Sequence, residues 1–310
     1  MSLDPLLARL IKITYKTDFA QLHTKSAHEV RKLVKTHHSN LLTGFYKSYK
    51  LPNGDEIKIF RPDESMPSSP LPLVFYGRGC GGIAPEPAEA KHYCAFLSKK
   101  LNSYIAVPSF RLAPEFKFPI GLNDGLTALK WLYSNDKLIG FDKDRIAVWG
   151  ESSGANALAV ICQLLRDEKL NFIKHQVLLY PTTDMVNHYP SKSLYRTGYL
   201  LEVNFLDWLL EHYLNHSSEK FDYRVSPLLN PNLSSLPSST IITAEYDPTR
   251  DEAEKYGLKL LESGNQVDMK RFNGVTHGFA VYHKRLKKAR EALDYACDNL
   301  FKYFKHSQVQ

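Results

Sequence analysis

The sequence has few of the features that mark exported, metal-binding or membrane proteins. It holds four cysteines in 310 residues, with no CxxC pair and no spacing typical of metal ligands. No apolar run approaches the ~18 residues of a membrane-spanning helix, and residues 1–19 lack the apolar core and cleavage site of a signal peptide. The 16 glycines and 17 prolines are too few for a low-complexity chain. We therefore expect a cytoplasmic protein with reduced thiols, no metal and no membrane span.

The composition is that of a globular protein with a moderate positive charge. Hydrophobic residues make up 43% and charged residues 24%. The 40 Lys and Arg exceed the 33 Asp and Glu, which gives a net charge of +7. The basic residues are scattered, and the densest group, 284–290, has the spacing of a solvated helix face. No nucleic-acid-binding motif accompanies this charge, so we expect no nucleic-acid partner.

The chain begins with two predicted helices and a hairpin and continues as an alternation of strands and helices. The hairpin is indicated by Asn53-Gly54 between two strand-like segments. The alternation predicts a mostly parallel sheet with helices on both faces. Residues 187–225 are rich in Tyr, Leu and His, interrupt the alternation, and are interpreted as an insertion above the sheet. The predicted strands are 42–51, 56–61, 73–76, 104–107, 145–149, 176–180, 240–244 and 267–272, and the predicted helices are about 3–20, 26–38, 86–100, 120–135, 153–167, 203–214, 249–263 and 284–305.

The sharpest motif is Gly150-Glu151-Ser152-Ser153-Gly154, between a predicted strand and a predicted helix. This is the context of a G-x-S-x-G nucleophile elbow, in which a strained turn presents the serine hydroxyl. The two glycines leave room for the tight turn, and the helix N-terminus points N–H groups at developing negative charge. We therefore predict Ser152 as the nucleophile, against the alternative that these serines only cap the helix.

A serine nucleophile needs a base and an orienting carboxylate, which in this type of fold follow it along the chain as acid and then histidine. Of the twelve histidines, we select His277, which lies between glycines in a loop after the last predicted strand. His283 is expected to face solvent. Asp247, directly after the strand at 240–244, is preferred as the acid. Asp251 is its rival, although either carboxylate also suits a helix N-terminus.

Several further segments carry a family resemblance. They are Phe110-Arg111-Leu112-Ala113-Pro114-Glu115 with Phe118-Pro119, residues 124–131, residues 144–156 around the elbow, residues 244–252, and His277-Gly278-Phe279. In order and spacing they resemble the hormone-sensitive-lipase-like branch of the α/β-hydrolases, which includes many bacterial carboxylesterases. The resemblance runs from about residue 71 to the C-terminus. It implies an α/β-hydrolase core (41–186 and 226–310) and a helical cap built from residues 1–40 and 187–225.

One segment departs from the family's pattern. Where the family carries His-Gly-Gly-Gly, this sequence has Gly77-Arg78-Gly79-Cys80-Gly81-Gly82. Aligned without gaps, the oxyanion-hole donors are the backbone N–H groups of Gly79 and Cys80, joined by that of Ser153. A slip of one or two residues would bring in Gly81 and Gly82 instead. Arg78 is interpreted as a solvent-facing or structurally paired residue rather than a ligand for an acidic substrate.

These residues predict a serine carboxylesterase that hydrolyses small, short-chain esters through an acyl-enzyme and needs no metal or organic cofactor. Cleavage of amides or aryl-formamides by the same triad is an alternative, as is a non-catalytic small-molecule receptor on the same fold. A homodimer is possible. The acyl pocket is predicted to be walled by aromatic side chains, namely Tyr195, Tyr199, Phe205, Trp208 and Phe279, with Tyr282 nearby.

Overall fold

The computed structural model describes residues 2–35, 44–63, 69–84 and 88–306. Its centre is an eight-stranded sheet in the order β1-β2-β4-β3-β5-β6-β7-β8. β2 is antiparallel to β1 and β4, and all other neighbours are parallel. The strands are β1 (Phe45–Lys50), β2 (Glu56–Arg61), β3 (Leu71–Gly77), β4 (Tyr104–Pro108), β5 (Phe141–Glu151), β6 (Ile173–Leu179), β7 (Ser238–Tyr246) and β8 (Val267–Thr276). The predicted sheet, mostly parallel and covered on both faces, is confirmed.

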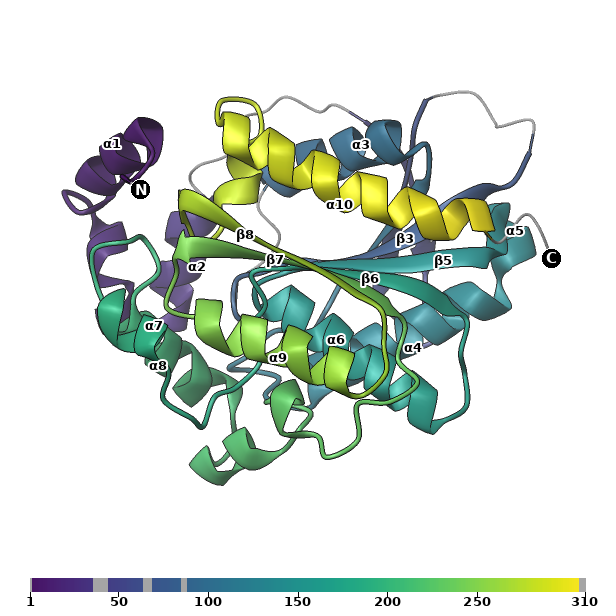
Figure 1. The fold of residues 1–310 in the computed structure, drawn as a ribbon. Coiled ribbons are helices and arrows are strands. Elements are labelled where there is room, and N and C mark those ends of the chain that lie inside the picture. Colours follow the sequence, from purple (N-terminus) through teal and green to yellow (C-terminus); the bar gives the residue numbers. More distant parts are fainter. Residues whose placement is uncertain (1, 36–43, 64–68, 85–87, 307–310) are drawn as a thin grey trace.

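Helices cover both faces of the sheet, as Figure 1 shows. α3 and α10 pack on one face, and α4, α6 and α9 pack on the other. The central strands are therefore buried on both sides, which explains why they read as continuous apolar runs. The helices are α1 (Pro5–Thr14), α2 (Ala27–Lys35), α3 (Ala88–Leu101), α4 (Ile120–Ser134), α5 (Asp136–Ile139), α6 (Ser153–Asp167), α7 (Pro190–Leu194), α8 (Val203–Tyr213), α9 (Arg250–Glu262) and α10 (Lys287–His306).

The elements differ from the prediction mainly at their ends. The helix expected at 3–20 ends at Thr14 and is followed by a 3₁₀ segment, Asp18–Thr24. There the Thr17 hydroxyl donates to the Thr14 carbonyl, a local bond that competes with continuation of the helix. The short helix α5 was not predicted, and β5 begins four residues early, at Phe141. Predicted residues 36–38, 42–43 and 86–87 lie outside the described part of the chain.

The hairpin between β1 and β2 forms as expected. Leu51 N donates to Asp55 O at 2.8 Å, and Gly54 has φ +88°, a value that favours glycine in tight turns.

The N-terminal helices lie against the 187–225 segment, at the end of the sheet where α7 and α8 are labelled in Figure 1. Ala27 and Val30 of α2 form a small apolar cluster with Trp208 of α8, separate from the main core. α1 reaches the core itself, because Leu7 is fully buried in the cluster under α3 and α10. Segments far apart in the sequence thus form one helical layer.

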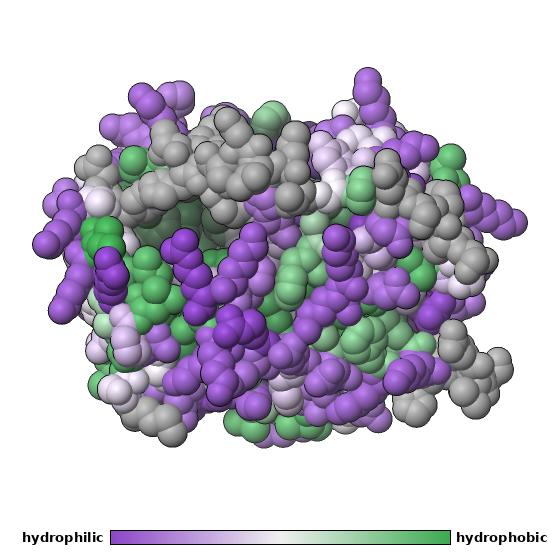
Figure 2. All heavy atoms as spheres, turned by 90° about the horizontal axis from the view of Figure 1, so that it is seen from above, coloured by the Kyte–Doolittle hydropathy of each residue, from purple (hydrophilic) through white to green (hydrophobic). Residues whose placement is uncertain are grey.

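The face over α3 and α10 is mostly polar. Figure 2 shows hydrophilic side chains over most of it, with hydrophobic ones in smaller patches between them. The apolar stripe of α10 turns inward, since Ala289, Leu293 and Leu300 are fully buried while Lys287 is exposed. In the described residues, no helix combines the length and the apolarity that crossing a membrane requires.

Candidate active site

Register places five residues at one edge of the sheet. Gly77 of β3 pairs with Gly150 of β5, Glu151 of β5 pairs with Leu179 of β6, and Tyr246 of β7 pairs with Thr276 of β8. The first residues beyond these strand ends are Arg78, Ser152, Tyr180, Asp247 and His277. Chain segments up to 200 residues apart therefore converge where ligands bind in open α/β sheets, beyond the carboxyl ends of the strands.

Ser152 occupies a strained turn between β5 and α6. Its φ of 53° and ψ of −125° are rare for a residue with a side chain. The flanking glycines are sterically required. A Cβ on Gly154 would lie 2.2 Å from the carbonyl oxygens of Gly77 and Arg78, and one on Gly150 would lie 2.5 Å from the Ala155 Cα. Gly154 thus allows the loop after β3 to pass close to the elbow.

The side chains of Ser152, His277 and Asp247 form a hydrogen-bonded row. His277 Nε2 lies 2.9 Å from Ser152 Oγ, and His277 Nδ1 lies 2.7 Å from Asp247 Oδ2. Asp247 is fully buried, and its other oxygen accepts hydrogen bonds from Thr249 N and Thr249 Oγ1, both at 2.8 Å. The carboxylate is thereby held with one oxygen facing the imidazole, an arrangement that fixes the Nδ1–H tautomer.

The rival residues lie elsewhere. Asp251 accepts hydrogen bonds from Ser191 N at 2.8 Å and from its neighbour Arg250, so it joins α9 to the 187–225 segment. His283 does not face solvent, and that prediction was wrong. The residue is 7% exposed, its ring stacks on that of Phe96 with centroids 4.4 Å apart, and this burial lowers the pKa of His283. The 3₁₀ turn Phe279–Tyr282 exposes Val281 instead.

The loop after β3 passes directly over the nucleophile. A Cβ on Gly79 would lie 3.2 Å from the Ser152 Cβ. Gly81 N donates to Ser153 Oγ at 2.7 Å, so this amide is already engaged. Within the described residues, the N–H groups of Gly79, Cys80 and Ser153 have no hydrogen-bond acceptor. Cys80 is exposed and has φ +81°, a left-handed conformation that disfavours its side chain.

Two arginines fasten this loop, and one of them was not singled out from the sequence. Arg31 of α2 donates from Nε to the Ile83 carbonyl at 2.8 Å and from Nη2 to the Ala113 carbonyl at 2.7 Å. It also binds Glu115 through both guanidinium nitrogens, at 2.8 and 2.6 Å, which lowers the pKa of that carboxyl to about 2. Arg78 has a structural partner, because it donates to the Ala84 carbonyl. No sequence signal marks Arg31, since its partners lie 52 to 84 residues away.

The predicted pocket aromatics fall into three groups. Tyr195 and Tyr199 pack against Tyr246, the residue before Asp247, with ring centroids 5.5 and 5.1 Å apart. Phe205 and Trp208 stack on each other in the helical layer. The prediction that Phe279 walls the acyl pocket is wrong, because this residue is fully buried in the main core and presents no surface to a ligand. Tyr282 is partly buried against the same core.

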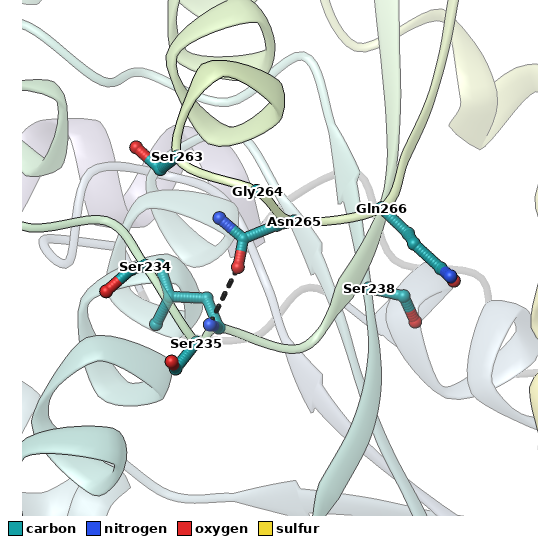
Figure 3. Close-up of a pocket in the computed structure, with 8 residues that line it drawn as sticks. Ser234, Ser235, Ser238, Ser263, Gly264, Asn265 and Gln266 are labelled. Atoms are coloured by element: carbon teal, nitrogen blue, oxygen red, sulfur yellow. Dashed lines mark hydrogen bonds between the residues drawn. The ribbon is translucent and has the colours of Figure 1, made fainter.

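A separate depression of about 350 Å³ lies at the other edge of the sheet (Figure 3). Its lining comes from the loops that precede β7 and β8, including Ser235, Gly264 and Asn265, and from Ser238, the first residue of β7. Apart from Gly264, the residues labelled in Figure 3 are serines, an asparagine and a glutamine, and Asn265 accepts a hydrogen bond from the Leu236 backbone N–H. The nucleophile elbow and His277 are at the opposite strand ends, so this depression does not serve them. Among the described residues, no group of three His, Cys, Asp or Glu side chains is arranged to hold a metal ion.

Comparison with known proteins identifies the class to which this fold and site belong. Residues 74–281 match the family described as alpha/beta hydrolase fold, and the chain belongs to that family. Within it, the chain lies in the hormone-sensitive-lipase-like branch, as its relatives and structural neighbours show.

These relatives are esterases. An arylesterase of Saccharolobus solfataricus is 31% identical over 292 residues, which cover 90% of this chain and 92% of the relative. An ethyl acetate hydrolase of Pseudomonas putida is 30% identical over 76% of this chain and 75% of the relative. The solved structure of a hyperthermophilic esterase from Pyrobaculum calidifontis is 29% identical, with a TM-score of 0.88 over 97% of this chain and 98% of that one.

Proposed function

We propose that this protein is a serine carboxylesterase that hydrolyses small, short-chain carboxylic esters. The single observation that carries the proposal is the unbroken row from Ser152 Oγ through the imidazole of His277 to the buried carboxylate of Asp247. The esterase names of relatives that align with most of the chain support the same reaction class.

The geometry suits a two-step acyl transfer. His277 Nε2 takes the proton of Ser152 Oγ as that oxygen attacks the ester carbonyl, and Asp247 stabilises the imidazolium that forms. The imidazolium then gives its proton to the departing alcohol oxygen, and the carbon–oxygen bond to the alcohol breaks. A water molecule, deprotonated by His277, next attacks the acyl carbon and releases the acid together with Ser152.

The tetrahedral oxyanion is proposed to bind the backbone N–H groups of Gly79, Cys80 and Ser153. Their lack of another acceptor in the described residues supports this assignment, as does the proximity of Gly79 to the Ser152 Cβ. Gly81 is a weaker candidate because its N–H binds Ser153 Oγ. Each good donor is worth about 10²–10³ in kcat.

The helical layer is proposed to be a cap over this site. The described residues of the N-terminal helices pack with the 187–225 segment, and we propose that residues 41–186 and 226–310, so far as they are described, form the hydrolase core. A Cβ on Gly81 would meet Leu209 of α8 at 2.5 Å, so the cap touches the proposed oxyanion loop. Tyr195, Tyr199, Phe205 and Trp208 belong to this layer and are proposed to border the substrate.

Two expectations stay predictions. We propose a cytoplasmic location, supported by four free cysteines, three of them buried. A homodimer is also proposed, and light scattering of the purified protein tests it.

Hydrolysis of p-nitrophenyl acetate, butyrate and longer esters by the wild type and Ser152→Ala tests the function. We expect the substitution to lower kcat by at least about 10⁴-fold without changing the melting temperature by more than a few degrees. Ser234→Ala, at the opposite edge of the sheet, is the matched control and should retain full activity. Equal rates in the wild type and Ser152→Ala would remove Ser152 as nucleophile.

A fluorophosphonate label separates this proposal from its alternatives. An esterase should be labelled at Ser152, whereas folded wild-type protein that resists labelling would point to a small-molecule receptor. Parallel assays with p-nitroanilide and aryl-formamide substrates measure the preference for esters over amides.

A further inference from the structure

A carboxylate is buried directly behind the proposed nucleophile. Glu151, the last residue of β5, is 5% exposed and has a tyrosine hydroxyl on each oxygen. Tyr76 donates to Oε1 at 3.0 Å, and Tyr180 donates to Oε2 at 2.8 Å. Neither partner is an arginine or lysine, so the charge is met by neutral donors. The mechanism described above does not use this residue.

Tyr180 connects this carboxylate to His277. The residue is 1% exposed, and its ring is tilted by 57° against the imidazole, with the two ring centroids 4.8 Å apart. Its φ of 39° is uncommon for a tyrosine, and the residue follows directly after Leu179, the last residue of β6. Both ends of the residue are held, because the backbone N–H donates to Ile242 O at 2.6 Å and the hydroxyl donates to Glu151. Tyr180 is therefore held by hydrogen bonds at its backbone and at its hydroxyl, and its ring covers one side of the His277 imidazole.

The burial of the Glu151 carboxyl lowers the free energy of unfolding. Burial raises the pKa of the Glu151 carboxyl, and the hydroxyls of Tyr180 and Tyr76 and the charge of a protonated His277 oppose that rise only in part. Tyr93 of α3 also faces the carboxylate, and burial raises the pKa values of Tyr76, Tyr93 and Tyr180 well above their usual range. These hydroxyls therefore stay neutral. Among the described residues, Glu151, hydrogen-bonded to the Tyr180 hydroxyl, and Asp247, at Nδ1, are acidic side chains on either side of the imidazole.

We propose that Glu151 is a positioning residue for the esterase reaction: it holds Tyr180 against His277, and its negative charge helps to stabilise the imidazolium formed during attack. This inference rests on the proposed function. A neutral donor or an apolar side chain at position 151 would fill the space without supplying the charge. Burying a carboxylate lowers the stability of the folded protein, whereas its negative charge stabilises the positive imidazolium in the transition state.

Glu151→Gln is the central test, because it keeps the shape and removes the charge. We expect kcat for p-nitrophenyl acetate to fall about tenfold with KM nearly unchanged, since the imidazolium forms after substrate binds. The acid limb of the kcat/KM profile should move to lower pH, because loss of the negative charge favours the neutral imidazole. The melting temperature at pH 7 should stay equal or rise, since an amide avoids the cost of the buried charge.

Three companion variants separate charge from packing. Glu151→Asp keeps the charge, so its acid limb should remain at the wild-type pH even where kcat falls. Tyr180→Phe should lower kcat in the same direction, and its effect should not add fully to that of Glu151→Gln, because the two residues act through one hydrogen bond. Tyr76→Phe removes the other hydrogen bond to the same carboxylate. Because the Tyr76 ring packs against Tyr93 rather than His277, this variant should have the smallest effect on kcat.

The outcomes distinguish the alternatives. A lower melting temperature for Glu151→Gln, with an unmoved pH profile, would reduce Glu151 to a structural residue and overturn the proposal. An unchanged kcat would overturn it as well. Failure of the proposed function itself would appear separately, as wild-type protein without esterase activity or fluorophosphonate labelling at Ser152.

Discussion

The two halves of the proposed site are held in different ways. The row of Ser152, His277 and Asp247 is positioned by strand ends of one sheet, in which Glu151 pairs with Leu179 and Tyr246 pairs with Thr276. The loop that carries Gly79 and Cys80 follows β3, and its far end is fastened by Arg31 from α2 and covered by Leu209 from α8.

This difference shows what positions each half of the proposed site. The row depends on side chains of fixed type that follow strands, so the sheet alone brings them together. The loop offers backbone N–H groups, whose direction depends on φ and ψ and hence on distant contacts. The row should therefore be sensitive to changes of single functional groups, and the loop to changes in its remote supports.

The largest expected effect concerns the row. Asp247→Asn should lower kcat by about 10³–10⁴-fold at pH 7, because an amide cannot stabilise the imidazolium and can favour the wrong tautomer. Esterase kinetics with p-nitrophenyl butyrate measure it. Asp251→Asn is the control four residues away, and its kcat should stay within about threefold of the wild type, since Asp251 binds Ser191 and Arg250 rather than His277. Equal losses in the two variants would contradict the assignment of the acid.

The next effect concerns the support of the loop. Arg31→Ala removes the hydrogen bonds to Ile83 and Ala113 and the paired contact with Glu115. We expect kcat to fall about tenfold and the free energy of unfolding to fall by about 2 kcal/mol, with the loop amides less well directed. Kinetics and urea denaturation measure the two quantities. Arg9→Ala, on the exposed side of α1, should change neither, and a full-activity Arg31→Ala would show that the loop needs no support from the N-terminal helices.

The next effect concerns stability rather than activity, at the contact between α9 and the 187–225 segment. Glu252 is fully buried, accepts from Thr183 N at 2.8 Å and lies 2.7 Å from Lys192 Nζ, while burial raises its pKa to about 7. The folded state then keeps a proton that the unfolded chain releases above about pH 4.5. The free energy of unfolding should therefore fall as pH rises from about 4.5 to 7, by up to about 3 kcal/mol, and level off above pH 7.

Glu252→Gln removes this part of the pH dependence. Urea denaturation at pH 5, 6, 7 and 8 should show a flatter profile than that of the wild type. Glu262→Gln, exposed at the end of the same helix, is the matched control and should keep the wild-type slope. A slope that survives in Glu252→Gln must belong to other groups.

The smallest effect concerns the side chain that departs from the family's pattern. Cys80→Gly removes the side chain at φ +81° but keeps the backbone N–H. The relief of strain and the greater freedom of the unfolded chain oppose each other, so the free energy of unfolding should change by less than about 1 kcal/mol. Activity should stay within about threefold of the wild type, and it should also do so in Cys80→Ala. A loss of 10²-fold in both would mean that the thiol, rather than the amide, contributes to the reaction.

What the sequence predicts correctly follows the same division. Residue type, order and strand context were enough to select three residues that the structure joins in one row, with His277 lying 2.9 Å from Ser152 Oγ and 2.7 Å from Asp247 Oδ2. The same reasoning misplaced His283 and Phe279, because the burial of a side chain near a turn depends on what packs on it, here Phe96 of α3 on His283 and Tyr180, just beyond β6, on Phe279. The sequence indicates no role for Glu151 or Arg31, because their hydrogen-bond partners are 29 to 84 residues away in the chain.

The sequence by itself determined the alternation of strands and helices, the elbow at Ser152 and the order of acid and histidine, because these depend on local periodicity, turn sterics and residue chemistry. Only the tertiary structure decided which amides of the Gly77–Gly82 loop lack other acceptors, how that loop is held, and that a buried carboxylate stands behind the nucleophile. Such features depend on backbone direction and burial, and both are set by contacts between segments that are distant along the chain.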